Sequence, residues 1–369
     1  MDLLVKRLLR LFLAAALVTL FTARPAAADL IEGTDDPDVL EGTSGNDTIR
    51  GFGGNDVIRG WAGHDRLEGG ADDDVINAGN GFDELDGGPG DDVLRGGFGP
   101  DELYSSGPGS DELYGGGQRD GLLLEGGQAV GYGGPATDQL FVSLGSVGVM
   151  YGEDGDDQLG AWDTSDAALH GGPGNDDFFD DSSGGTVLMY GGPGNDEFDI
   201  NGVVAGIWAG PGNDLVILQR CCGSHMTGPV VGGEGDDVLD TQDDNADVVR
   251  CGPGRDRARI DLADTVTGCE VIEHRISGDH EDNVLTGTPF NDIFDDFLGD
   301  DVMSGLGGDD VFFVDGGSDT IDGGAGDDSI FAEDDVPEAD TIVCGPGEDF
   351  VGADSLDIVA ADCETVQRF

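Results

Sequence analysis

The stretch from Gly87 to Arg95 reads G-G-P-G-D-D-V-L-R, and the repetition of its pattern decides the fold. Eight consecutive nine-residue units of this kind run from Gly33 to Tyr104, and Ser106 to Tyr114 form a ninth. The sixth residue of each unit is always Asp: Asp38, Asp47, Asp56, Asp65, Asp74, Asp83, Asp92, Asp101 and Asp111. The eighth residue of the first eight units is Leu or Ile, and the fourth is Gly in six of them. This regularity predicts a solenoid, in which each unit packs mainly on its neighbours.

These units match the pattern G-G-x-G-x-D-x-U-x and resemble the RTX, or hemolysin-type, calcium-binding nonapeptide repeats. The resemblance implies an all-β protein, a right-handed parallel β-roll with two nonapeptides per turn. In such a roll six residues form a calcium loop and three form a short strand, so that stacked loops lie 18 residues apart. The resemblance further implies that sixth-position carboxylates and loop carbonyls share each Ca²⁺ between neighbouring turns. It therefore pairs Asp38 with Asp56, and Asp47 with Asp65.

The chemistry of these residues supports the same interpretation. Ca²⁺ takes six to eight oxygen ligands, and Gly-Asp loops supply carboxylates together with backbone carbonyls. Stacked strands lie about 4.8 Å apart, which brings carboxylates of successive turns together. At roughly 5 Å and an effective dielectric constant near 20, each like-charge pair costs about 3 kcal/mol. We therefore expect multiple Ca²⁺ ions as cofactors, and folding that is coupled to their binding.

The middle of the chain keeps the loops but doubles their spacing. Loops begin at residues 133, 152, 171, 191, 209, 232 and 251, at steps of 18 to 23 residues, which is about one whole turn. Their sixth-position acids are Asp138, Asp157, Asp176, Asp196, Asp214, Asp237 and Asp256. The stretches between the loops carry apolar residues but no Gly-x-Gly-x-Asp sequence. This spacing predicts a roll with one calcium column, and with ordinary metal-free turns on the opposite edge.

A second array of five nonapeptides runs from Gly287 to Phe331, with sixth-position residues Asp292, Asp301, Asp310, Asp319 and Asp328. Two related segments follow the arrays: C-G-P-G-R-D from Cys251 leads to Cys269-Glu270, and C-G-P-G-E-D from Cys344, with Asp349 in sixth position, leads to Cys363-Glu364. They resemble the terminal Cys segments of secreted RTX-repeat proteins of actinobacterial type. We expect two consecutive rolls, residues 29–276 and 277–369, each closed by a disulfide-pinned cap. A single roll with an internal pin is the alternative.

The six cysteines allow fifteen connectivities. The duplicated segments favour Cys251–Cys269 and Cys344–Cys363. Cys221 and Cys222 are left over. A bond between adjacent cysteines is strained, because consecutive Cα atoms lie about 3.8 Å apart, so free thiols and a cross-chain bond are the alternatives there.

The N-terminus is typical of an export signal. Lys6, Arg7 and Arg10 precede an apolar run from Leu11 to Ala23, and Ala26-Ala27-Ala28 supplies a small-residue cleavage site. The prediction is a signal peptide over residues 1–28 and a secreted, extracellular protein, with an uncleaved membrane anchor as the alternative. Removing the leader leaves 12 basic and 77 acidic residues. A surface so acidic repels phosphate groups, so nucleic acid and anionic lipid are poor partners. No nucleic-acid partner and no membrane span are expected.

The tiled repeats leave little room for a catalytic domain, and no nucleophile, zinc-protease or phosphate-loop motif occurs. The first hypothesis is therefore a calcium-dependent structural or interaction protein outside the cell, which is not an enzyme and whose macromolecular partner is unidentified. A calcium-dependent enzyme that modifies polysaccharides is the second hypothesis, and a toxin-related protein is the third. A toxin of the related type carries a long hydrophobic region and acylated lysines, whereas this chain has no Lys after the leader.

Overall fold

The protein is seen in a computed structural model that describes residues 28–143, 145–163, 166–181, 185–218, 225–243, 245–261, 263–332 and 338–369. All regular elements in these residues are β-strands, as the repeat predicts. The predicted leader lies outside the described residues except for its last residue, Ala28, and Cys221 and Cys222 also lie outside them. The described chain contains no helix of the length and apolarity that a membrane crossing requires.

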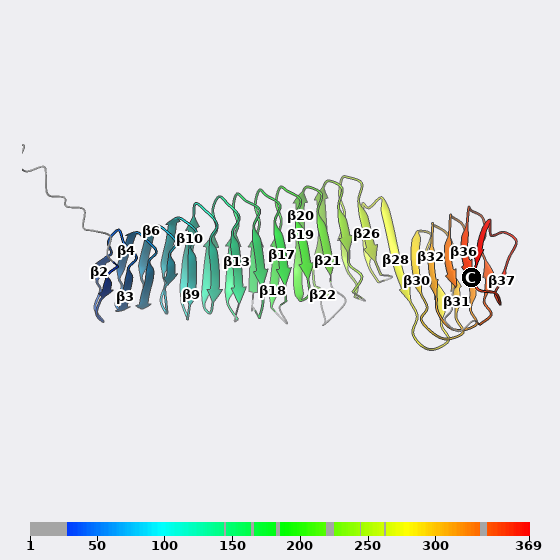
Figure 1. Ribbon diagram of the computed structural model, residues 1–369, viewed down its shortest axis with the longest axis horizontal. Coiled ribbons are helices and arrows are strands. Elements are labelled where there is room, and N and C mark those ends of the chain that lie inside the picture. The colour runs from blue at the N-terminus through cyan, green and yellow to red at the C-terminus, as the bar shows by residue number, and fades with distance from the viewer. Residues whose placement is uncertain are drawn as a thin grey trace, which may run out of the picture.

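The strands form an extended parallel solenoid (Figure 1). One sheet, here the long sheet, runs through the whole solenoid and contains β1 (Leu30–Glu32), β3 (Thr48–Gly53), β5 (Arg66–Ala71), β7 (Glu84–Asp86), β9 (Glu102–Ser106), β11 (Gly121–Glu125), β13 (Gln139–Ser143), β15 (Gln158–Ala161), β17 (Asp177–Asp180), β19 (Glu197–Ile200), β21 (Leu215–Leu218), β24 (Val238–Asp240), β26 (Arg257–Ile260), β28 (Val271–Ser277), β30 (Asn291–Asp295), β32 (Val311–Val314), β34 (Ser329–Ala332), β36 (Phe350–Ala353) and β38 (Thr365–Arg368).

Two shorter sheets complete the turns. The N-terminal sheet contains β2 (Val39–Glu41), β4 (Val57–Ala62), β6 (Val75–Asn80), β8 (Val93–Phe98), β10 (Ser110–Gly116), β12 (Gln128–Tyr132), β14 (Val147–Tyr151), β16 (Asp166–His170), β18 (Thr186–Tyr190), β20 (Val203–Pro211), β22 (His225–Met226), β23 (Pro229–Glu234), β25 (Val248–Arg250) and β27 (Thr265–Thr267). The C-terminal sheet contains β29 (Val284–Thr286), β31 (Val302–Ser304), β33 (Thr320–Asp322), β35 (Thr341–Val343) and β37 (Ile358–Val359). The chain alternates between the long sheet and a short one, so each pair of strands makes one turn.

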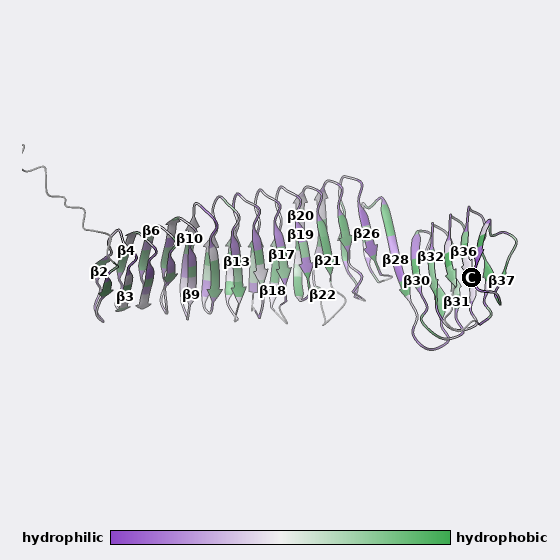
Figure 2. Ribbon diagram, in the orientation of Figure 1, coloured by the Kyte–Doolittle hydropathy of each residue, from purple (hydrophilic) through white to green (hydrophobic). Residues whose placement is uncertain are grey.

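The predicted 18-residue register is confirmed in the first array. Leu40 pairs with Ile58, and Ile58 with Ile76, in the N-terminal sheet. Ile49 pairs with Leu67 in the long sheet. The eighth-position side chains form two facing rows that fill the space between the sheets, and all are fully buried except Leu40, at 9% exposure. Hydrophobic and hydrophilic residues therefore alternate along the strands (Figure 2).

The core becomes wider in the middle of the chain. Each strand of the first array buries one large aliphatic residue, whereas a typical middle strand buries two apolar residues, such as Leu140 with Val142 in β13. Phe178 and Phe198 also stack inside this core, with ring centroids 4.5 Å apart. Each fully buried large apolar side chain adds about 1.5–3 kcal/mol. The additional apolar burial stabilises the middle turns, which have a column of sixth-position aspartates on one edge only.

A row of stacked rings follows the outer face of the N-terminal sheet. Neighbouring rings lie 4.6 to 5.2 Å apart in the order Tyr114, Tyr132, Tyr151, His170, Tyr190 and Trp208. Strand register produces the stack, because directly paired residues of parallel strands lie about 4.8 Å apart. The ring faces cover one another, so the row stabilises the middle turns through contacts between adjacent strands.

The solenoid shifts sideways at β28. Residues from Val271 to His274 pair with β26, whereas residues from Glu273 to Ser277 pair with β30. The core is correspondingly divided: one apolar cluster ends at Ile260 and the other begins at Ile276. Figure 1 shows β28 as a slanted strand between the two parts. The division into two domains at Ser277 stays a prediction, since the long sheet is continuous across this position.

Candidate metal centre

The sixth-position acids form columns along the edges of the solenoid, where the loops of successive turns stack. The long column contains Asp47, Asp65, Asp83, Asp101, Asp120, Asp138, Asp157, Asp176, Asp196, Asp214, Asp237 and Asp256. The short column contains Asp38, Asp56, Asp74, Asp92 and Asp111. In the second part, Asp301, Asp319, Asp340 and Asp357 form the Asp301 column, and Asp292, Asp310, Asp328 and Asp349 form the Asp310 column.

One hydrogen bond repeats along every column. The backbone N–H of each Asp donates to Oδ1 of the Asp in the next turn, at 2.7 to 2.9 Å throughout the long column. The predicted pairs are among these contacts: Asp38 donates to Asp56 at 2.8 Å, and Asp47 donates to Asp65 at 2.7 Å. The bond fixes one carboxylate oxygen and points the other into the space between two loops.

That second oxygen has no hydrogen-bond donor at most of the predicted sites. Oδ2 is buried without a partner in Asp56, Asp65, Asp74, Asp83, Asp92, Asp101, Asp138, Asp157, Asp176, Asp196, Asp214, Asp237, Asp256, Asp301, Asp310, Asp319, Asp328 and Asp349. A buried carboxylate oxygen without a partner costs free energy, and buried charges normally are paired or bind a metal. A long row of such atoms is therefore the donor set that a hard cation requires.

The first residue of the loop shapes the space around this oxygen. At Gly115, an added Cβ would lie 2.6 Å from Oδ2 of Asp120 and 2.7 Å from the carbonyl oxygen of Gly133 in the next turn. Gly323 shows the same arrangement, with Oδ2 of Asp328 at 2.6 Å and the carbonyl oxygen of Cys344 at 2.7 Å. Carboxylate and carbonyl oxygens thus border one small space that a larger side chain would fill. The residues present fit a bound Ca²⁺.

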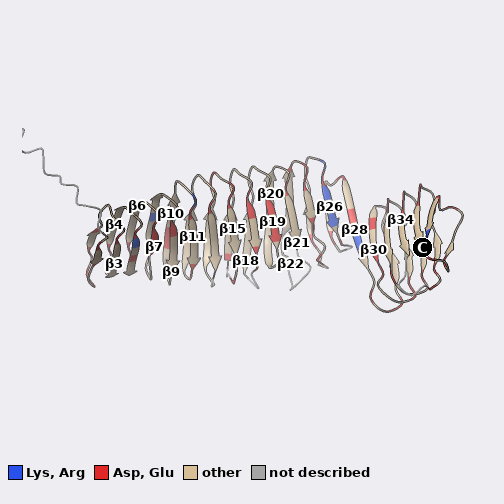
Figure 3. Ribbon diagram, viewed as in Figure 1, with Lys and Arg blue, Asp and Glu red and all other residues tan. Residues whose placement is uncertain are grey.

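Burial raises the pKa of these carboxyl groups. The pKa rises from 3.8 to about 8 for Asp120, Asp176 and Asp310, chiefly because burial removes water from the charged form. The hydrogen bond from the preceding turn lowers each pKa, and neighbouring column carboxylates raise it. Acidic residues occur along the whole solenoid, while basic residues are few (Figure 3). Nδ1 of His274 lies 3.2 Å from Asp292 and Arg119 lowers the pKa of Asp138, but such protein cations are few beside the columns.

Threonine occupies the second loop position at the start of three of the four columns. The hydroxyl and backbone N–H of Thr34 both donate to Asp38, and Thr43 and Thr288 contact Asp47 and Asp292 in the same way. In these three predicted ligands, Asp38, Asp47 and Asp292, Oδ2 therefore already accepts hydrogen bonds from the protein. Asp111, the last acid of the short column, likewise accepts a hydrogen bond from Ser105. These four carboxylates differ from the other predicted ligands and form column ends.

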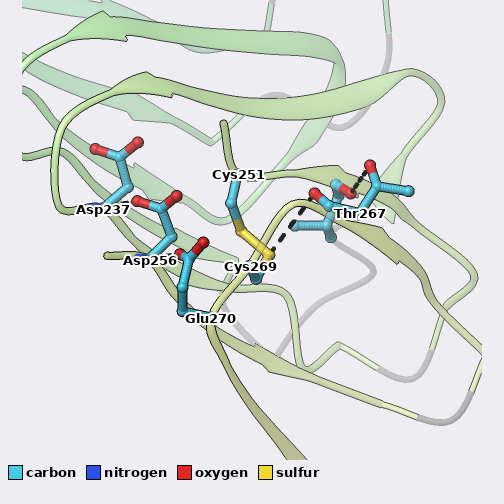
Figure 4. Close-up of a disulfide and its surroundings, with 7 residues drawn as sticks. Asp237, Cys251, Asp256, Thr267, Cys269 and Glu270 are labelled. Atoms are coloured by element: carbon cyan, nitrogen blue, oxygen red, sulfur yellow. Dashed lines mark hydrogen bonds between the residues drawn. A yellow bond between two sulfur atoms is a disulfide. The ribbon is translucent and has the colours of Figure 1, made fainter. Parts of the chain in front are cut away.

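At the other end, a glutamate takes the place of the next aspartate. The backbone N–H of Asp256 donates to Glu270 at 2.9 Å, and that of Asp349 donates to Glu364 at 3.0 Å. Figure 4 shows Asp237, Asp256 and Glu270 one after another beside the Cys251–Cys269 disulfide. Only 14 residues separate Asp256 from Glu270. The final turn is thus shorter than the others, and the longer side chain of Glu reaches back to the column.

Both predicted disulfides are present. Cys251 bonds to Cys269 and Cys344 bonds to Cys363, each with Cα atoms 5.2 Å apart. Cys251 and Cys344 are fully buried and occupy the first position of the last loop in each part. Each bond therefore attaches the shorter terminal turn, with its glutamate, to the end of a column.

Removing the first disulfide is expected to loosen the cap of the first part. Because the bond closes a loop of about 18 residues, the variant C251S/C269S should lose about 3 kcal/mol in the chain-entropy account. Urea unfolding of the calcium-loaded protein under non-oxidising conditions, followed by circular dichroism, measures this loss. The variant C344S/C363S is the matched control for the second cap. Unchanged midpoints in both variants would contradict a stabilising role for the bonds.

Several column residues do not follow the repeat closely and were absent from the predicted set. Asp120 ends the loop G-G-G-Q-R-D, which has Gln in place of the fourth Gly, and it joins the first array to the middle loops. The spacing of 19 residues from Asp101 and 18 residues to Asp138 was the signal that identifies it. Asp340 ends the sequence D-V-P-E-A-D, which contains no glycine and carries no comparable signal.

The edge opposite the long column has ordinary turns in the middle of the chain, as the spacing predicts. Asp111 pairs in the sheet with Ala129, and Ala129 pairs with Gly148, so the short column ends there. Hydrogen bonds of Ser146 connect the turns here: its hydroxyl donates to the Ser143 carbonyl and accepts the N–H of Gly126 at 2.7 Å. Carboxylates on this edge include Asp180, which is buried at the end of β17, and Asp247, which donates its N–H to Asp264 at 2.8 Å.

Comparison with known families agrees with this geometry. The family model described as the RTX calcium-binding nonapeptide repeat, in four copies, matches residues 32–67, 68–103, 230–257, 277–312 and 304–336. No match was found among curated proteins. Repeats of this family bind Ca²⁺ at multiple sites. The matched segments leave residues 104–229 between them, yet the long column continues through this stretch in unbroken register. The chain therefore carries RTX calcium-binding nonapeptide repeats on a parallel β-solenoid fold.

Proposed function

We propose that this protein is a secreted structural element whose solenoid is completed by Ca²⁺ ions bound between successive loops. The observation that carries the proposal is the row of buried Oδ2 atoms that have no protein donor. Each ion would be held by Oδ2 of column aspartates together with first-position carbonyl oxygens of the neighbouring turn. The positive charge would neutralise the stacked carboxylates, which otherwise repel one another by about 3 kcal/mol per pair.

The ligands in this proposal are the predicted sixth-position acids whose second oxygen lacks a donor, with Asp120 added. Asp38, Asp47, Asp111 and Asp292 would contribute less, because threonine or serine already donates to their carboxylates. In the middle of the chain the ions would lie along one edge only. The opposite edge, which turns through serine and glycine, is then the surface on which a macromolecular partner could bind without displacing an ion.

An extracellular location supports this role. Ca²⁺ is abundant outside cells, and extracellular calcium modules need only weak affinities, with Kd values of about 10⁻⁴–10⁻³ M. The two disulfides suit an oxidising compartment. We further propose that residues 1–28 are removed during export. A structural role is favoured over a catalytic one because most of the described carboxyl groups with strongly raised pKa values, such as Asp120, Asp176 and Asp310, lie in regular columns along the solenoid.

The register of the repeat gives a direct test of the ligand assignment. Asp92 is buried and its Oδ2 has no donor, whereas its neighbour Asp91 is exposed. Asp92→Ala should remove calcium from the adjacent loops and destabilise the calcium-loaded roll by about 2 kcal/mol or more, since a buried hydrogen bond is also lost. Asp91→Ala should change stability by no more than about 0.5 kcal/mol.

Isothermal titration calorimetry with CaCl₂ counts the bound ions, and urea unfolding measures stability. We expect several ions per chain in the wild type and in Asp91→Ala, and fewer in Asp92→Ala. Equal losses in both variants would mean that bulk acidic charge, and not the nonapeptide register, binds the ions. A wild-type chain that binds no calcium would overturn the proposed function.

A further inference from the structure

One loop of the second part departs from the repeat at its first position. The loop from Asp296 to Asp301 reads D-F-L-G-D-D, so that Asp replaces the usual Gly. Among the loops in the described ranges, the other first positions hold Gly, or at a few turns Ala, Ser, Val or Cys. Asp296 therefore places a carboxylate at a position where most loops present only a backbone carbonyl to the space between turns.

Asp296 joins two column aspartates at that space. One carboxylate oxygen from each of Asp296, Asp301 and Asp319 lies within 4.8 Å of the others. Oxygens on opposite sides of one Ca²⁺ are about 4.6–5.2 Å apart, given Ca–O distances of 2.3–2.6 Å. The three side chains come from two successive turns of the Asp301 column: Asp296 and Asp301 bracket one loop, and Asp319 ends the next.

The protein satisfies only one oxygen of each group. Oδ1 of Asp296 accepts the N–H of Asp315 at 2.8 Å, while Asn283 and Asp301 donate their N–H groups to Oδ1 of Asp301 and Asp319, both at 2.6 Å. Oδ2 of all three residues is buried without a donor, and each residue is 1% exposed. None of these three described carboxylates forms an ion pair with a basic side chain.

Ordinary spaces between turns in this protein are bordered by two column carboxylates, with carbonyl oxygens completing the set. The space at Asp296 has a third carboxylate, and Asp315 and Asp340 add further negative charge nearby. The affinity of oxygen-ligand calcium sites rises with the number of charged ligands and with the rigidity of the site. Here the charge is greater and each carboxylate is already oriented by a backbone N–H.

We propose that Asp296, Asp301 and Asp319 bind one Ca²⁺ through three carboxylates and form the tightest calcium site of the protein. This inference rests on the proposed calcium-binding function, and it adds a ligand that the nonapeptide repeat does not contain. The loop connects β30 to β31, and β31 pairs with β33, the strand that follows Asp319. As the tightest site, it would be the first to be occupied when calcium is limiting. It would hold together the turns that follow the β28 shift.

The test replaces Asp296 in the full chain in two ways. Asp296→Gly restores the residue that the repeat normally has, so the fold should tolerate it, and Asp296→Asn removes the charge but keeps the shape. Asp322→Asn is the matched control, because Asp322 is an exposed acid on β33 of the same part. Calcium is titrated in competition with a chromophoric chelator, which resolves the tightest site, and circular dichroism verifies the fold of each calcium-loaded variant.

We expect Asp296→Gly and Asp296→Asn to raise the dissociation constant of the most tightly bound Ca²⁺ by at least about tenfold. The dissociation constants of the weaker sites, and all those of the Asp322→Asn variant, should stay at wild-type values. If both Asp296 variants bind like Asp322→Asn and the wild type, the three-carboxylate site is wrong and the general calcium-binding function survives. If the wild type binds no Ca²⁺ at all, both proposals fail.

Discussion

Removing Ca²⁺ with excess chelator at neutral pH is expected to abolish most of the β-structure of this protein. The columns place carboxylates of successive turns together, and their Oδ2 atoms have no protein donor. The first array buries a single large aliphatic residue per strand, worth about 1.5–3 kcal/mol each, against a backbone entropy cost of about 1–2 kcal/mol for every ordered residue. Without the cations, this part of the solenoid has too little apolar burial to offset both costs.

Circular dichroism during a calcium titration measures the transition. The chelated chain should show a largely disordered spectrum, and millimolar or lower Ca²⁺ should restore the β-spectrum cooperatively. Mg²⁺ should be a poor substitute because it requires a smaller octahedral shell and retains its waters. The middle turns, with two apolar residues per strand and the row of stacked rings, should be the last to lose structure. An identical β-rich spectrum in metal-free chelator and in calcium would contradict coupled folding.

The regular part of this structure could be predicted from the repeat because its two fixed positions have separate physical roles. The sixth residue needs a carboxylate for the column, and the eighth needs an aliphatic side chain for the core, as Asp92 and Leu94 illustrate. The change from nine-residue to roughly nineteen-residue spacing predicted a single calcium column in the middle. In the described residues the short column of sixth-position aspartates ends at Asp111, which pairs with Ala129, while the calcium itself stays a prediction.

The remainder depends on contacts that lie across turns and leave no local pattern. Asp120 and Asp340 occupy their columns through strand register, although the loop of Asp120 lacks the fourth-position Gly and the five residues before Asp340 include no Gly. The two-fold pairing of β28, with β26 at one end and β30 at the other, follows from no motif in residues 271–277. Asp296 reads in the sequence as one more surface acid, and only the neighbouring turn shows that its carboxylate meets Asp319.

The second large effect that we expect is a reversal of pH dependence when calcium is removed. Burial raises the pKa of Asp120, Asp176 and Asp310 from 3.8 to about 8 in the folded chain. A group whose folded pKa exceeds its unfolded value stabilises the fold fully below the unfolded pKa, and that stabilisation is lost as pH rises through the folded pKa. The calcium-free chain should therefore become more folded between about pH 8 and pH 5, since protons replace the missing cations.

Circular dichroism of the chelated protein from about pH 8 to pH 5 tests this, above the isoelectric point near 4.1 at which the chain would precipitate. The double variant D120N/D176N needs no protons at these two sites and should be more folded than the wild type at about pH 8 without calcium. The matched control D154N/D166N removes two exposed charges from the same region and should leave the transition nearly unchanged. Equal shifts in both variants would show that total charge, and not the buried columns, sets the pH dependence.

With saturating Ca²⁺ the sign should be opposite. Carboxylates must be ionised to bind the metal, so protons compete with Ca²⁺ and the calcium-loaded fold should lose stability as the pH falls. The two stability profiles then converge at acidic pH, where protonated carboxyl groups hold the same columns without metal. A calcium-loaded protein that becomes more stable on acidification, in parallel with the chelated protein, would mean that the ions bind elsewhere than at the buried Oδ2 atoms.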